Sequence, residues 1–99
     1  MIRVIYEWHV SRGNLQEFSE AWEQTTVLVR EIYQGAHGST LLQDGSRADH
    51  VLTIARWNSE EDWRNFWTSD NPPEIMKMSK LGNLLSVKVY EELGHYISK

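Results

Sequence analysis

Residues 38–63 constrain the fold more than any other part of this chain, because they combine a turn signal with two apolar runs. The first run, residues 39–43, ends at Asp44-Gly45, a dipeptide that is typical of tight turns. The second run, residues 51–57, follows that turn. The pattern predicts two strands joined by a tight turn.

A helix is expected directly after Trp57, because Ser59 and Asp62 have the three-residue spacing of a helix-opening capping pair. Trp57 therefore lies where a strand becomes a helix. A bulky indole at such a junction, next to the aromatic side chains of the helix, can form the wall of a pocket for a flat apolar molecule. Those helical side chains are Trp63, Phe66 and Trp67.

The N-terminal third predicts one strand and one long helix. Apolar side chains recur at every second position of residues 2–10, and Ile5 adds an apolar side chain to the other face. Helical spacing of apolar side chains then extends over residues 15–33. Asn14 and Glu17 have the spacing of a second capping pair, which predicts the start of this helix.

The C-terminal third predicts a short helix over 59–69, a break at the two prolines of 71–73, another helical turn within 74–80, and a last strand over 84–93. The resulting order is βαββαβ. It predicts an α+β ferredoxin-like sandwich, an antiparallel sheet with its helices on one face. We expect residues 1–99 to form a single domain.

Composition excludes several classes of function. The net charge of −4 and the absence of a basic stripe argue against a nucleic-acid partner. No apolar run reaches the roughly 18 to 20 residues that span a bilayer, so no membrane partner is expected. The absence of cysteine excludes disulfides and thiolate metal ligands. With no signal-peptide pattern at the N-terminus, the sequence predicts a cytoplasmic protein.

A homodimer is expected, because helices cover only one face of the predicted sheet. Ile5, Leu52 and Ile54 place apolar side chains on the other face. A chain of 99 residues also buries only about 60 to 65% of its unfolded surface, so its own core is marginal. The same face of a second copy would cover the open face with two-fold symmetry.

The strand-to-helix passage ARWNSEED at 55–62, together with GSTLLQDG at 38–45, resembles the antibiotic biosynthesis monooxygenase (ABM) family. The resemblance extends over residues 2–93 and implies a dimeric α/β barrel. Members of this family include cofactor-free oxygenases that act on aromatic phenols or quinols. For this chain the resemblance implies a monooxygenase without a cofactor, with a small aromatic substrate as its partner.

The resemblance also implies site residues. Trp57 corresponds to a pocket tryptophan, Lys77 lies near a basic residue of the family, and Thr53 stands where the family has an asparagine. With His9 as a proton acceptor, these three are the expected catalytic residues. The expected substrate-binding residues are Trp57, Trp63, Phe66, Trp22 and Met76.

Three alternatives remain open. The same pocket could serve a dimer that binds or senses a small molecule without turnover. Haem degradation is a third choice, although Met76 rather than a histidine occupies the region of the iron ligand. Trp22 could instead be core filling on the apolar stripe of its helix.

No metal site is expected, because the spacing of the histidines matches no metal-binding motif; they are His9, His37, His50 and His95.

Overall fold

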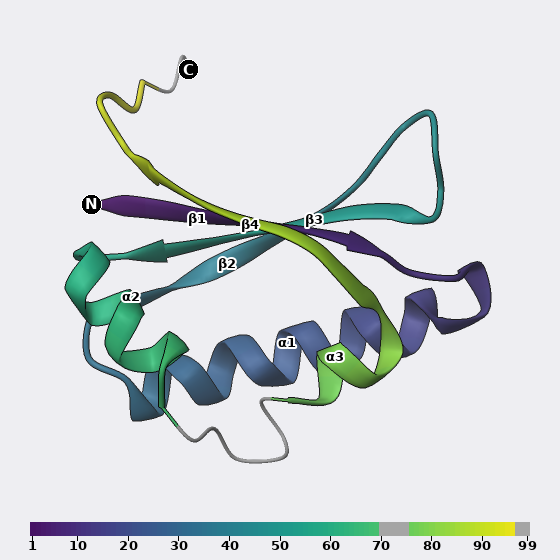
Figure 1. Ribbon diagram of the computed structural model, residues 1–99, viewed down its shortest axis with the longest axis horizontal. Helices are drawn as coiled ribbons and strands as arrows, with labels where there is room; N and C mark the ends of the chain where they lie inside the picture. Colours follow the sequence, from purple (N-terminus) through teal and green to yellow (C-terminus); the bar gives the residue numbers. More distant parts are fainter. Residues whose placement is uncertain (70–75, 97–99) are drawn as a thin grey trace.

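The computed structural model describes residues 1–69 and 76–96. Figure 1 shows a four-stranded sheet with its helices on one side. In chain order the elements are β1 (Ile2–His9), a 3₁₀ turn (Arg12–Asn14), α1 (Leu15–Ile32), β2 (Ala36–Gln43), β3 (His50–Trp57), α2 (Glu60–Trp67), α3 (Lys77–Leu81) and β4 (Asn83–Glu91).

The strands lie in the order β2-β3-β1-β4, and every neighbouring pair is antiparallel. The two outer strands therefore come from the middle and the end of the chain. This topology confirms the predicted α+β ferredoxin-like fold. β1 is an inner strand because it pairs with β3 on one side and with β4 on the other, and its register with β3 runs from Ile2 opposite Trp57 to His9 opposite His50.

The core lies between the sheet and α1. Strand alternation points Val4, Tyr6 and Trp8 of β1 toward the helices, and all three side chains are buried. From α1, Phe18 and Ala21 are buried at the three-residue spacing of one helix face. The rings of Trp8 and Phe18 meet edge to face with centroids 5.2 Å apart, so the sheet and the helix interlock here.

Two helix starts had the same sequence signal, and only one forms the predicted cap. At α2 the Ser59 hydroxyl accepts a hydrogen bond of 3.1 Å from the Asp62 backbone N–H. At α1 the prediction was wrong, because Asn14 makes no side-chain cap. The 3₁₀ turn already gives Asn14 helical dihedral angles, and its side-chain amide donates to the Leu81 carbonyl oxygen instead.

The connection between β2 and β3 is longer than the predicted tight turn. Residues 44–49 form a loop in which the Asp44 carboxylate accepts the backbone N–H groups of Ser46 and Arg47. β2 also begins earlier than predicted, at Ala36, with a register irregularity before Gly38. The predicted break at 71–73 and the first part of the helical turn at 74–80 lie outside the described residues, and α3 begins at Lys77.

The sheet face opposite the helices is uncovered in the single chain (Figure 1). Ile5, Leu52 and Ile54 lie on this face only half-buried, and Tyr90 beside them is 48% exposed. Among the described residues, no helix has the length and apolar character required to cross a membrane.

Candidate functional site

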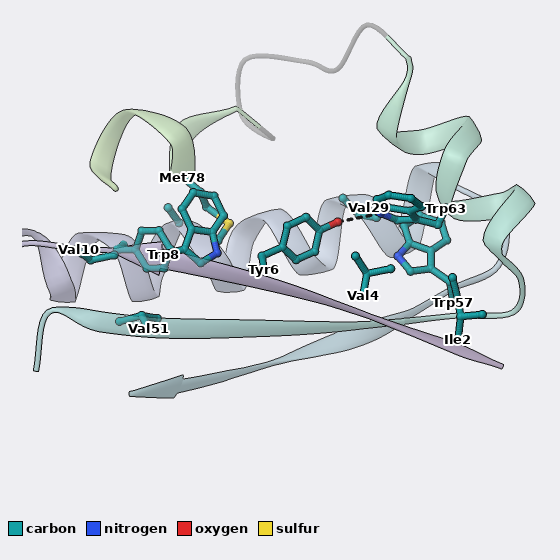
Figure 2. Packing of buried hydrophobic residues seen from close by; sticks show 12 residues of the cluster. Ile2, Val4, Tyr6, Trp8, Val10, Val29, Val51, Trp57, Trp63 and Met78 are labelled. Carbon is teal, nitrogen blue, oxygen red and sulfur yellow. Dashed lines mark hydrogen bonds between the residues drawn. The ribbon is translucent and has the colours of Figure 1, made fainter. Parts of the chain in front are cut away.

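A cavity of about 420 Å³ lies between the inner face of the sheet and the three helices. Its volume falls in the range of about 300 to 1,000 Å³ that is usual for small-molecule sites. Figure 2 shows Tyr6 near the centre of this layer, with Trp8 and Met78 on one side and Trp57 and Trp63 on the other.

Trp57 lines the cavity at the strand-to-helix junction, as the sequence predicts. Its side chain is only 2% exposed, and its ring stacks on Phe66 of α2 with centroids 5.4 Å apart. The indole nitrogen faces the interior in Figure 2, and no described residue accepts its proton. Trp57 therefore brings a flat wall and one unused N–H donor to the cavity.

Two tryptophans fix hydroxyl groups in the floor of the site. The Trp8 indole N–H donates to the Thr53 hydroxyl at 3.0 Å, and the Trp63 indole N–H donates to the Tyr6 hydroxyl at 2.9 Å. Because an indole is only a donor, each hydroxyl oxygen acts as the acceptor and keeps its own proton to donate. Burial raises the pKa of Tyr6 to about 12, so this phenol is protonated at neutral pH and can donate.

The wall formed by α1 and β2 repeats this arrangement. The Trp22 indole N–H donates to the Ser39 hydroxyl at 3.0 Å. Thr26, one turn along α1, donates its hydroxyl proton back to the Trp22 carbonyl oxygen at 2.8 Å. Thr25 differs from both, because its hydroxyl oxygen is buried beside the cavity with no partner in the described part of the chain.

Two arginines are among the lining residues, Arg30 on α1 and Arg56 on β3; among the described residues no carboxylate and no histidine lines the cavity. The Arg56 side chain lies on the opposite face of the sheet, where its guanidinium is 3.6 Å from a carboxylate oxygen of Glu92. Arg30 forms no ion pair within residues 1–69 and 76–96. The site therefore has a positive bias and no evident base.

The structure brings together most of the expected site residues, but two lie elsewhere. Trp57, Thr53, Trp22, Phe66 and Met76 line the cavity, and Trp63 supports it through Tyr6. Lys77 is an exposed residue of α3 outside the lining. His9 projects from the opposite face of the sheet, where its ring lies 3.2 Å from a carboxylate oxygen of Asp49.

The other histidines are equally remote from the cavity. His50 bonds Glu7 and Asp44, His37 bonds Asn58, and His95 lies beside Arg3. Among the described residues no group of three or more histidine, cysteine, aspartate or glutamate side chains could hold a metal ion. Haem would lack a histidine ligand in this cavity, and Met76 is a poor substitute for oxygen chemistry.

Sequence reasoning missed several functional candidates, among them Tyr6, Thr25, Arg30 and Ser39. The sequence pattern assigned Tyr6 to the apolar face of an alternating strand. It assigned Thr25 to the apolar face of the long helix. A signal was present for Thr25, since a hydroxyl on an otherwise apolar helix face needs a partner.

Comparison with known proteins agrees with the fold. No curated protein matches this sequence. SnoaB, a cofactor-independent oxygenase from Streptomyces nogalater, is 16% identical with a TM-score of 0.77, over 95% of this chain and 94% of that chain. A Bordetella bronchiseptica protein named for the ABM family is 18% identical with a TM-score of 0.80, over 93% and 96%. A conserved protein from Methanosarcina mazei is 18% identical with a TM-score of 0.72, over 92% and 91%.

These structural matches show a shared fold of the dimeric α/β barrel type at low sequence identity. The family assignment rests on the sequence itself. Residues 1–74 match the family described as antibiotic biosynthesis monooxygenase, and this range contains β1, α1, β2, β3 and α2. The chain therefore belongs to the antibiotic biosynthesis monooxygenase family.

Proposed function

We propose that this protein is a cofactor-free monooxygenase of a small aromatic phenol or quinol, bound in the cavity beside Trp57. The observation that carries the proposal is an aromatic-walled cavity whose free polar groups are hydrogen-bond donors, in a chain of this family. Such a cavity suits a planar molecule that bears oxygen atoms.

In the proposed reaction, the bound phenolate gives an electron to dioxygen, and the two radicals join as a peroxide on a ring carbon. That carbon loses its hydrogen and becomes a carbonyl, and the second oxygen atom leaves as water. A phenol is thus oxidised to a quinone with one dioxygen consumed. The protein's part is to exclude water and to donate hydrogen bonds to the developing peroxide, from Trp57 and Thr53.

We further propose a homodimer through the uncovered sheet face. Half-buried Ile5 and Ile54 are register neighbours at the centre of this face, and Tyr90 lies at its edge. The C-terminal tail extends on the same side, where Leu93 and Tyr96 are 95% and 91% exposed. Burial of these side chains would supply the apolar contact of a permanent interface. The cytoplasmic location stays a prediction.

The test is oxygen consumption with a panel of hydroquinones, anthrones and dihydroxynaphthalenes, without added metal or flavin. Trp57→Phe keeps a ring on Phe66 but removes the N–H donor, so we expect at least a tenfold loss of uptake. Lys77→Gln is the control, because Lys77 is exposed and outside the lining. No uptake by the unmodified protein with any member of the panel would reject the oxygenase.

The second candidate function is a dimer that binds or senses a small molecule without turnover. The absence of a carboxylate or histidine among the described lining residues favours it, because nothing there can abstract a proton. Binding of a panel compound without oxygen uptake would establish this function instead.

A further inference from the structure

The free polar groups along one side of the cavity are hydrogen-bond donors that have no acceptor within the described residues. Ser39, Thr53 and Tyr6 each use an oxygen lone pair to accept an indole N–H, and none has an acceptor for its own proton in the described part of the chain. The indole N–H of Trp57 is unused as well. A ligand that fits these groups must carry acceptor oxygens.

Thr25 adds a second, independent observation. Its hydroxyl oxygen is buried and has no partner within residues 1–69 and 76–96, although its neighbour Thr26 satisfies its own hydroxyl on the Trp22 carbonyl. A buried hydroxyl without a partner costs about 1 to 3 kcal/mol. Thr25 lies one helical turn from Trp22, whose indole holds Ser39, so both free hydroxyls belong to the same wall. A ligand that offers an acceptor oxygen to each of them would satisfy both.

The charge of the lining further restricts the chemical class of the ligand. Arg30 lies on the same side of α1, at one- and two-turn spacing from Thr26 and Trp22, and its side chain passes over Gly38. It is exposed and has no carboxylate partner within the described residues. With no acid in the described lining, an anionic group near Arg30 gains attraction and meets no repulsion.

We propose that this wall recognises an aromatic carboxylate: a planar ring in the cavity, with its carboxylate and adjacent oxygen at Thr25 and Ser39 and its charge toward Arg30. The inference rests on the proposed function for the choice of an aromatic ligand, and it narrows the substrate class to acids.

The first test compares an acid with its own neutral ester. Isothermal titration calorimetry with 1-hydroxy-2-naphthoate and with methyl 1-hydroxy-2-naphthoate separates charge from ring shape. We expect the acid to bind at least tenfold more tightly, which corresponds to about 1.4 kcal/mol. Arg30→Gln should remove that preference, whereas Arg12→Gln, the same change on the remote 3₁₀ turn, should keep it. Equal binding of acid and ester would overturn the proposal.

The second test compares a threonine of the wall, Thr25, with a threonine outside the lining, Thr40. Thr25→Val removes the unpartnered hydroxyl at nearly constant shape, so we expect acid affinity to fall about tenfold while the melting temperature stays the same or rises. Thr40→Val is the control, because Thr40 is exposed on β2 and outside the lining, and it should leave acid affinity within twofold. Unchanged acid affinity in Thr25→Val, or an equal loss in both variants, would reject Thr25 as a ligand contact.

Binding and turnover are measured separately, so the two proposals fail separately. Tight binding of the acid without oxygen uptake from any phenol would reject the oxygenase and support the acid site. Oxygen uptake from neutral quinols, with no preference for the acid in calorimetry, would support the oxygenase and reject the acid site.

Discussion

Indole N–H groups in this protein bond to side-chain hydroxyls at three places around one cavity. The pairs are Trp8 with Thr53, Trp22 with Ser39, and Trp63 with Tyr6. Each pair joins two separate elements, so each bond fixes a large ring and also holds a hydroxyl in a defined position. At the scale of single residues, packing and the chemistry of the site therefore depend on the same groups.

Loss of the Thr53 hydroxyl should lower the stability of the protein, whereas loss of the Thr25 hydroxyl should not. Thr53→Val leaves the buried Trp8 N–H without an acceptor, so we expect the free energy of unfolding to fall by about 1 to 3 kcal/mol. Thr53→Ser keeps the oxygen and should lose less stability than Thr53→Val. Urea unfolding followed by circular dichroism measures both, and equal loss in the two variants would contradict the role of this bond.

At the scale of elements, the turn between α1 and β2 is tied to the start of α2. Gly35 has a φ of +88°, its carbonyl oxygen accepts the Asn58 N–H at 2.9 Å, and a Cβ on it would collide with the Asp62 carboxylate. Both features require glycine. The contact matters for the site, because Trp57 lies next to Asn58 at the junction of β3 and α2.

Gly35→Ala should therefore destabilise the protein by at least 1 kcal/mol, since alanine is strained at this φ and α2 must also shift. Gly45→Ala is the matched control, because a Cβ there meets nothing within 4 Å. Thermal unfolding of the two variants measures the difference. An equal melting temperature for both variants would contradict the requirement for glycine at residue 35.

A polar cluster joins β1, β3 and the loop between β2 and β3. The His50 ring lies 2.9 Å from an Asp44 oxygen and 2.7 Å from a Glu7 oxygen. The bonds to Asp44 and then Glu7 raise the pKa of His50. The bond from His50 lowers the pKa of Glu7, and the backbone N–H of Ser46 followed by His50 lowers the pKa of Asp44.

These shifts set the pH range in which the cluster stabilises the fold. The histidine contribution is complete below its ordinary pKa of about 6.5 and is lost as pH rises through its higher folded value. The carboxylate contributions are complete above about 4.5 and are lost as pH falls through their lower folded values. We expect His50→Gln to lower the urea midpoint most near pH 5.5 and least near pH 9. A difference that does not vary with pH would contradict this.

In the single chain, one sheet face is covered by helices and the other is uncovered, and the proposed homodimer would cover it. Ile54→Arg places a charge at the centre of the open face, so we expect light scattering to report the mass of one chain instead of two. Val27→Arg is the control, because Val27 is 52% exposed on α1. A monomeric unmodified protein would reject the dimer at once.

The sequence could predict the elements because their signals are local. Strand alternation in β1, the helical spacing of α1 and the Ser59 cap all lie within a few residues and were confirmed. The Asn14 cap failed because the 3₁₀ turn gives Asn14 helical dihedral angles, and its side-chain amide donates to the Leu81 carbonyl oxygen, 67 residues away. The bounds of β2 were set by pairing with β3, which no local pattern shows.

Local sequence patterns were sufficient to predict the order of elements, the fold class, and an aromatic wall at Trp57. Which polar groups share the cavity depends on how distant segments pack. Strand alternation turned His9 to the opposite face, and α3 left Lys77 outside the lining. The packing of α1 on β2 left the Thr25 hydroxyl without a partner among the described residues. Periodicity assigns a side chain to a face, whereas its partners depend on contacts between distant segments.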